Sequence, residues 1–98
     1  MSSVEAKTET SIKLKLPTLY KVVLVNDDFT PMEFVVNVLL ELFAKSHAEA
    51  MTLTNEIHER GRGVAGTYIQ SIAEQKVKDV AIAAQHHGHP LKAKAIPA

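Results

Sequence analysis

Apolar positions along the chain change their spacing several times, and each change predicts one element of structure. Residues 20–25 form a β-branched and aromatic run that stops at residues 26–28, Asn-Asp-Asp, which are typical turn residues. This pattern predicts a strand that leads into a polar loop. Residues 64–69 and 91–96 have a similar strand character, so the chain contains three predicted strands.

A helical period follows the polar loop. Thr30 is the expected N-cap, Pro31 the first helical residue, and Glu33 the acidic residue that completes a capping box. The helix is expected to end near Lys45. Its apolar residues are spaced for one wide face and comprise Phe34, Val35, Val38, Leu39, Leu42 and Phe43.

Two further helices are expected. Ser46 is the expected N-cap of a helix that Gly61 ends, and Ser71 opens a third helix with Glu74 at its third position and Gly88 at its end. The order is strand, helix, helix, strand, helix, strand. It predicts an α+β fold in which a small three-stranded antiparallel sheet packs against three helices as a two-layer sandwich.

The N-terminal residues differ from the rest of the chain. Residues 1–19 are rich in Ser, Thr, Lys and Glu and are expected to form a flexible tail, whereas residues 20–98 are expected to form one folded domain. The longest apolar run, Val80 to Ala84, is far shorter than the roughly 20 residues that span a bilayer. The first residues contain no hydrophobic targeting segment, so a soluble, cytoplasmic protein is expected.

Composition narrows the function classes. The chain has 98 residues, 46% of them hydrophobic, with 11 basic residues against 11 acidic ones. This balance removes the electrostatic attraction that nucleic-acid binders draw from phosphates. The absence of Cys excludes a disulfide framework, a thiolate zinc site and a cysteine nucleophile. Neither a cofactor nor an oligomer is required by any feature of the sequence.

The polar loop and one histidine are the candidates for chemistry. Asn26, Asp27 and Asp28 either form a turn that caps the following helix or offer acceptor oxygens to a cation or an amine. His58 either interacts with the dipole at its helix C-terminus or provides an acceptor nitrogen to a ligand. Both interpretations remain open for both sites.

Two other functions are compatible with single features. A small hydrolase would use Asp27 or Asp28 with His58 as acid and base, but no Ser or Thr lies in a recognisable nucleophile motif. A metal-binding domain would use histidines near the C-terminus, which lack the spacing that puts two imidazoles on one helical face. These histidines are His86, His87 and His89.

A long motif carries a resemblance to a known family. Residues 20–35, YKVVLVNDDFTPMEFV, closely resemble the signature of the ClpS family, the adaptors of the ATP-dependent Clp protease. His58, the glycine-containing residues 61–66, the stretch Ile72–Val77 and the stretch His89–Leu91 follow in the family's order and spacing. The resemblance extends from residue 19 to about residue 92.

The resemblance implies a binding module without enzyme chemistry. ClpS adaptors bind protein substrates that begin with Phe, Tyr, Trp or Leu and deliver them to a hexameric AAA+ unfoldase such as ClpA. The residues implied to hold the substrate α-amino group are Asn26, Asp27, His58 and, near the first peptide unit, Thr30. Those implied to form the side-chain pocket are Met32, at its mouth, with Val35, Thr54, Ile57 and Leu91. Those implied to dock onto the unfoldase are Ser71, Glu74 and Lys76.

The chain departs from the family pattern at two of these positions. Thr54 stands where the family commonly has a pocket-lining Met, so a smaller and more polar pocket wall is expected. Ser71 stands where several relatives have a Glu that contacts the unfoldase. The preference among Phe, Tyr, Trp and Leu and the docking affinity are therefore expected to differ from those of relatives.

Overall fold

The computed structural model describes residues 18–98 and has the predicted order of elements. The residues 1–17 of the predicted tail lie outside the described part, and Leu19 already belongs to the first strand. The elements are β1 (Leu19–Val25), α2 (Met32–Leu42), α3 (His47–Arg60), β2 (Arg62–Ile69), α4 (Gln70–His87) and β3 (Lys92–Pro97). Each predicted strand and helix is present, so the α+β prediction is confirmed.

The three strands form one antiparallel sheet in the order β2-β1-β3. β1 occupies the centre because it is the most apolar strand, and its Val22 and Leu24 are fully buried. In the pairing with β2, Val22 lies opposite Gly66, whereas Val23 lies opposite Val64. The register shift between these pairs leaves Ala65 as a bulge on β2.

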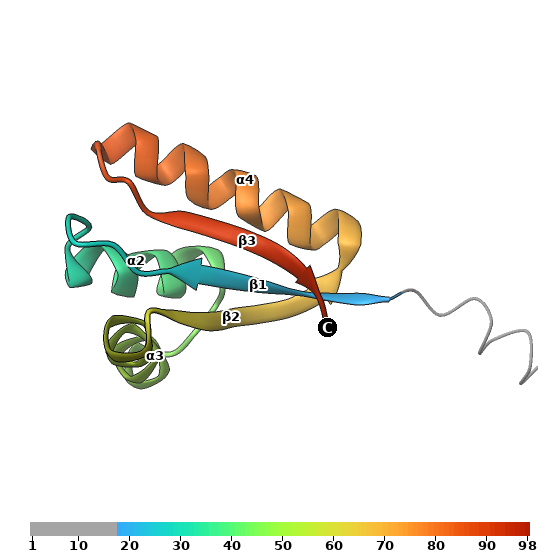
Figure 1. Cartoon of the computed structure of the whole chain (residues 1–98), viewed down its shortest axis with the longest axis horizontal. Coiled ribbons are helices and arrows are strands. Elements are labelled where there is room, and N and C mark those ends of the chain that lie inside the picture. The colour runs from blue at the N-terminus through green and yellow to red at the C-terminus, as the bar shows by residue number, and fades with distance from the viewer. Residues whose placement is uncertain (1–17) are drawn as a thin grey trace, which may run out of the picture.

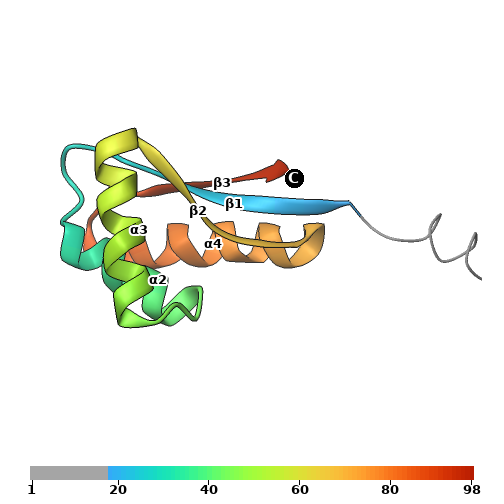
Figure 2. The ribbon, with the colours of Figure 1, turned by 90° about the horizontal axis from the view of Figure 1, so that it is seen from below.

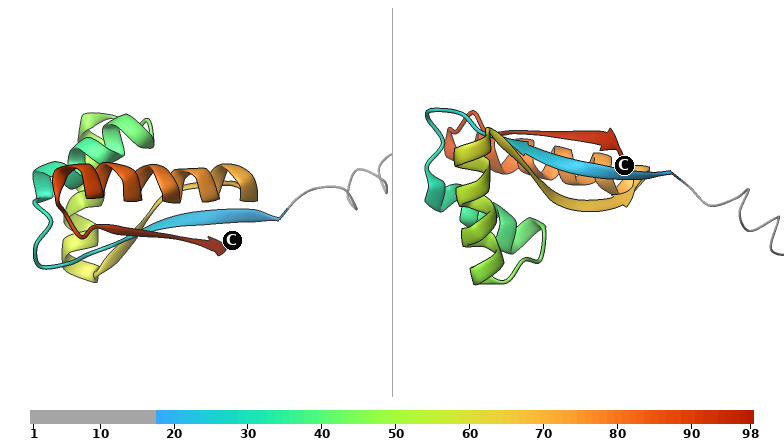
Figure 3. Two further views of the ribbon diagram at one scale, coloured as in Figure 1. Left: turned by 90° about the horizontal axis from the view of Figure 1, so that it is seen from above. Right: turned by 60° about the horizontal axis from the view of Figure 1, so that its bottom comes forward.

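The three helices cover one face of the sheet (Figure 2). α4 runs along the strands and contacts β1 and β3, while α2 contacts both α3 and α4 (Figures 1 and 3). The core lies between these two layers, and it includes Val22, Leu24, Val35, Leu39, Ile57, Val80 and Leu91. The predicted two-layer sandwich is therefore confirmed. None of the helices within residues 18–98 is long and apolar enough to cross a membrane.

A glycine lets α3 approach the sheet closely. A Cβ atom added at Gly63 of β2 would lie 2.8 Å from Ile57 Cγ1 and 3.0 Å from Leu53 Cδ1. A larger residue at this position would force the Ile57 and Leu53 side chains to shift. Gly63 therefore allows Ile57 to pack closely against β2.

The start of α3 and the C-terminal ends of α3 and α4 lie where the sequence predicted them. The Ser46 hydroxyl accepts a hydrogen bond from the Glu49 N–H at 3.1 Å, and the Glu49 carboxylate accepts one from the Ser46 N–H at 3.0 Å. This capping box starts α3. Gly61 and Gly88 end α3 and α4 in the left-handed region, with φ of 88° and 73°.

Three predicted helix boundaries were wrong. α2 begins at Met32 with Pro31 as N-cap and no side-chain cap, because the Thr30 hydroxyl bonds to Asp27 instead. α2 ends at Leu42 rather than near Lys45, because Ala44 takes a left-handed conformation with φ of 52°. α4 begins one residue before Ser71, with Ile69 as N-cap and no capping hydrogen bond from a side chain.

Candidate functional site

The loop between β1 and α2 is folded around the Asp27 carboxylate. Its Oδ1 accepts hydrogen bonds from the Phe29 N–H at 2.8 Å and the Thr30 N–H at 2.6 Å. Its Oδ2 accepts one from the Thr30 hydroxyl at 2.7 Å. Asp27 therefore makes the turn that its position predicted, and it makes it by bonds to residues two and three positions ahead.

These hydrogen bonds keep the Asp27 carboxylate ionised. Burial alone raises the pKa of Asp27, but the bonds from the Thr30 hydroxyl and from the two backbone N–H groups, with His89 nearby, outweigh burial and lower the pKa below its ordinary value. A carboxylate has about four acceptor positions, of which three are used here. One acceptor position and the negative charge remain for a ligand.

A backbone hydrogen bond ties this loop to the end of α3. The Asn26 N–H donates to the Gly61 carbonyl oxygen at 2.9 Å. The contact brings the last turn of α3, with His58, to the same cavity as the loop. The cavity has a volume of about 180 Å³. It is lined by Asn26, Asp27, Asp28, Thr30, Met32, Val35, Thr54, Ile57 and His58.

The cavity has a polar rim and a buried wall. Asn26, Asp27 and Thr30 are half-buried, and His58 and Met32 are exposed. The wall consists of side chains that are almost completely buried, namely Val35, Thr54 and Ile57, at 6%, 3% and 2% exposed. The structure thus gathers eight of the nine residues implied for substrate binding around one cavity, with hydrogen-bonding groups outside and mainly apolar groups inside.

One implied pocket residue lies elsewhere, and the cavity has one lining residue to which the resemblance assigned no role. Leu91 is packed in the core at 4% exposed and is not among the residues that line the cavity, so its role in binding stays a prediction. Asp28 lines the cavity although the resemblance assigned it no role. Its place in the polar loop had already made it a candidate for binding a cation or an amine.

Thr54 has an unusual environment for a hydroxyl. Within residues 18–98, no group forms a hydrogen bond with its Oγ1, although the atom is buried. Leaving a buried hydroxyl without a partner costs about 1–3 kcal/mol. Thr54 and Met32 also line a second, larger groove of about 620 Å³ between α2 and α3.

The residues implied to dock onto the unfoldase differ in their exposure to solvent. Ser71 and Glu74 are exposed on the first turns of α4, beside Ile72, which is 46% exposed. Lys76 is half-buried, and its ammonium group donates a hydrogen bond to the Leu42 carbonyl oxygen at 2.6 Å. Lys76 therefore caps a carbonyl group at the C-terminus of α2, and the sequence alone did not reveal this contact.

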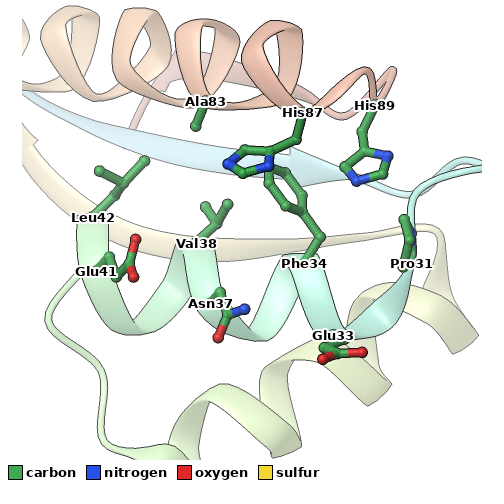
Figure 4. Close-up of a pocket in the computed structure, with 10 residues that line it drawn as sticks. All are labelled: Pro31, Glu33, Phe34, Asn37, Val38, Glu41, Leu42, Ala83, His87 and His89. Carbon is green, nitrogen blue, oxygen red and sulfur yellow. The ribbon is translucent and has the colours of Figure 1, made fainter.

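Two of the three histidines near the C-terminus, His87 and His89, pack against the Phe34 ring. In the cleft between α2 and α4, the ring centroids of His87 and His89 lie 5.4 Å and 4.6 Å from that of Phe34 (Figure 4). In the described part of the chain, no group of three or more His, Cys, Asp or Glu side chains is placed to hold a metal ion. The metal-binding alternative therefore gains no support from residues 18–98.

The fold and the cavity define a small α+β binding domain, and comparison with known proteins assigns it to a family. Residues 15–94 match the family described as "ATP-dependent Clp protease adaptor protein ClpS". The ATP-dependent Clp protease adapter proteins ClpS of Burkholderia cenocepacia (strain HI2424) and Burkholderia pseudomallei (strain 668) are each 52% identical over 80 residues, which cover 82% of this chain and 77% of theirs. The chain therefore belongs to the ClpS family of adaptors, which act with the Clp protease and are not themselves proteases.

A solved structure supports the same assignment. The structure of Agrobacterium tumefaciens ClpS2 bound to L-phenylalaninamide matches with a TM-score of 0.82 and 36% sequence identity. The match covers 85% of this chain and 100% of that chain. The fold, including the sheet and all three helices, is thus the ClpS fold.

Proposed function

We propose that this adaptor binds the first residue of protein substrates that begin with Phe, Tyr, Trp or Leu and delivers them to a Clp AAA+ unfoldase. The observation that carries the proposal is the cavity itself, in which acceptor groups lie at the rim of a mainly apolar wall. A protein N-terminus presents both matching features, an ammonium group and a side chain on the same carbon atom. No internal residue presents the ammonium group.

The rim suits an α-amino group. Its pKa of about 7.7 to 8.0 makes it mostly ammonium at neutral pH, with three donor hydrogens. The complementary acceptors are the ionised Asp27 carboxylate, the Asn26 side-chain oxygen and an acceptor nitrogen of the His58 imidazole. An internal peptide would leave these acceptors unpaired, at about 1–3 kcal/mol each.

The buried wall suits one large apolar side chain. The cavity volume of about 180 Å³, which includes the polar rim, is close to the roughly 150 Å³ of an apolar protein cavity that binds benzene, and this size supports a six-membered ring as the bound group. The Agrobacterium ClpS2 structure contains L-phenylalaninamide, which has a free α-amino group and a phenyl ring. This relative supports the same ligand class for the present chain.

The test is binding of two peptides that differ only in N-terminal acetylation. A peptide beginning with Phe is expected to bind with micromolar or lower Kd, and its acetylated form to bind at least 10-fold more weakly, because acetylation removes the ammonium group. Fluorescence anisotropy with a labelled C-terminus measures both. Equal affinities would exclude the proposed amine recognition.

Asp27 is poorly suited to the hydrolase alternative, in which Asp27 or Asp28 would act with His58 as acid and base. A general base works best when its pKa lies near the operating pH, whereas the pKa of Asp27 is lowered. Its two oxygens already accept three hydrogen bonds within the loop. Asp27 is therefore suited to holding a cation rather than to accepting a proton.

We propose that the unfoldase contacts the exposed start of α4, and the different environments of Glu74 and Lys76 allow a direct test. Glu74→Ala is expected to weaken binding to the unfoldase without changing the melting temperature, because Glu74 is exposed. Lys76→Ala is expected to lower the free energy of unfolding by about 1–2 kcal/mol, because the Leu42 carbonyl loses a charged donor. Calorimetry and a pull-down with the hexamer separate the two effects. If Glu74→Ala binds the hexamer normally, this part of α4 is not the docking site.

A further inference from the structure

No helix within residues 18–98 covers the second face of the sheet (Figure 2). Side chains alternate along a strand, so Val22 and Leu24 of β1 point into the core, whereas Lys21 and Val23 point to the opposite face. Residues paired across neighbouring strands share a face, and the register therefore assigns the residues of β2 and β3 as well. The face of Lys21 and Val23 is the open face.

The charged side chains of the open face are all basic. They are exposed and belong to Lys21, Arg62, Lys92 and Lys94. None of the three strands contains Asp or Glu, although the whole chain has 11 acidic residues against 11 basic ones. The one salt bridge within residues 18–98 joins Arg60 to Glu56 and involves no residue of the open face. The balanced chain therefore has a sheet face of one sign.

Solvation and edge protection do not account for this face. Lys92 and Lys94 lie two residues apart on β3, so their side chains leave the strand on one side at positions about 7 Å apart. Like charges repel at this distance, which is shorter than the Debye length of about 8 Å. Charged residues commonly protect an edge strand such as β3, but Lys21 belongs to the central strand. Edge protection also works with charges of either sign.

The open face also exposes large aliphatic side chains. These are 40% to 47% exposed and belong to Leu19, Val64, Ile69 and Ile96. Leu19 pairs with Ile69 at the end of the sheet where β1 begins. Arg62 and Lys92 flank Val25 at the other end, next to the loop. A complementary partner therefore needs carboxylate groups and apolar side chains together.

We propose that the open face is a docking surface for an acidic protein segment, whose carboxylates contact the basic side chains and whose apolar side chain contacts Ile96. Lys92, Lys94 and Ile96 occupy alternate positions of one strand. An extended segment with two acidic residues and one apolar residue at alternate positions has the same spacing. Residues 1–17 of this chain do not fit, because they contain three Lys against two Glu. The inference does not depend on the function proposed above.

A nucleic acid matches the open face less well. Proteins that bind single strands combine basic residues with aromatic side chains on which the bases stack. The two tyrosines of the sheet, Tyr20 and Tyr68, pack against the core on the other face. The open face offers aliphatic side chains instead, which suit the apolar residues of a protein segment.

The test is an NMR titration of the ¹⁵N-labelled full chain with a peptide that repeats Glu-Ser-Glu-Ser-Leu-Ser twice. The peptide is acetylated, so it has no α-amino group for the cavity. We expect a Kd of roughly 1 mM or lower and shifted amide signals on the strands, with unchanged signals for Val35 and Ile57. A peptide with Gln in place of Glu is expected to bind about 10-fold more weakly. Raising NaCl from about 50 mM to about 300 mM should weaken binding of the Glu peptide.

Two double variants with the same net charge locate the site. Lys92→Gln with Lys94→Gln removes two charges of the open face and is expected to weaken binding of the Glu peptide at least about 5-fold. Lys45→Gln with Lys78→Gln removes two charges outside the sheet and is expected to leave the affinity unchanged. Melting curves of both variants confirm that the protein is folded.

The outcomes decide for or against the acidic segment. Strand signals that shift with the Glu peptide, together with a loss confined to the Lys92 and Lys94 variant, would establish the docking surface. Equal losses in both double variants, or shifts confined to the cavity or to α4, would overturn it. It would also be overturned if anionic lipid vesicles or a single-stranded oligonucleotide shifted the strand signals and the Glu peptide did not.

Discussion

The loop at residues 26–30 and the wall formed by Val35, Thr54 and Ile57 border the same cavity but are built in opposite ways. The loop is polar and partly exposed, and its central carboxylate makes its hydrogen bonds to residues that follow it directly. The wall is buried and is assembled from two helices, and its one hydroxyl, that of Thr54, has no partner within residues 18–98.

This difference suggests separate tasks for the two regions. The loop has its shape before a ligand arrives, so it can present acceptors to any free α-amino group without rearranging. The wall consists mainly of buried aliphatic side chains, so the size and shape of the first side chain determine how closely it packs there. We therefore expect changes in the loop to affect all substrates alike and changes at the wall to affect some more than others.

The largest effect is expected from Asp27→Ala. The change removes three hydrogen bonds and the negative charge, so all peptides that begin with Phe, Tyr, Trp or Leu should bind at least 10-fold more weakly. The free energy of unfolding should also fall by about 1–3 kcal/mol. Calorimetry and chemical denaturation measure these quantities.

Asp28→Ala is the matched control for Asp27→Ala. Asp28 is the neighbouring exposed carboxylate, and we expect its loss to leave the free energy of unfolding within about 0.5 kcal/mol of the parent. If both variants lose stability to the same extent, Asp27 does not organise the loop. If Asp27→Ala lost binding for peptides with some first residues but not others, the loop would not act on all substrates alike, which would also contradict the comparison.

A smaller and selective effect is expected from Met32→Ala. Met32 is 42% exposed at the start of α2 and lines the cavity mouth and the adjoining groove. A shorter side chain should admit peptides that begin with Val or Ile, whose branched β-carbon would contact Met32. We expect their affinities to rise about 3- to 10-fold while those of Phe peptides change little. If peptides that begin with Val or Ile bound the variant and the parent equally well, Met32 would have a packing role and no role in selecting the first residue.

The smallest effect is expected from acidification. Because the pKa of Asp27 is lowered in the folded protein, its contribution to stability is present above its unfolded pKa of about 3.9 and is lost as the pH falls through the folded value. Thr30→Val removes the hydroxyl donor to the carboxylate, so the free energy of unfolding should depend less on pH below about pH 4.

The contribution of Glu49, whose pKa is also lowered by its bonds to Ser46, is common to both proteins and cancels in the comparison. Thr52→Val serves as the control, because this threonine lies on the exposed surface of α3. Identical acid profiles for Thr30→Val and the parent would show that the hydroxyl bond does not hold the Asp27 pKa down.

Features that depend on near neighbours were predictable from the sequence. The polar loop, the turn at Asp27, the Ser46 cap and the glycine ends of α3 and α4 rest on interactions within a few residues, so residue type and spacing specify them. The prediction that Thr30 caps α2 was wrong, also because of an interaction between near neighbours. Two local partners competed for one hydroxyl, and the charged acceptor at Asp27 forms the stronger bond.

The sequence by itself determined the order of elements, the polar loop and the family resemblance of the chain. Only the tertiary structure decided that the Lys76 ammonium bonds to the end of α2, that Leu91 packs in the core, and that the Thr54 hydroxyl has no hydrogen-bond partner among residues 18–98. Each of these depends on how helices and strands distant in sequence are placed against one another. Such placement follows from packing the whole core at once, and no local pattern encodes it.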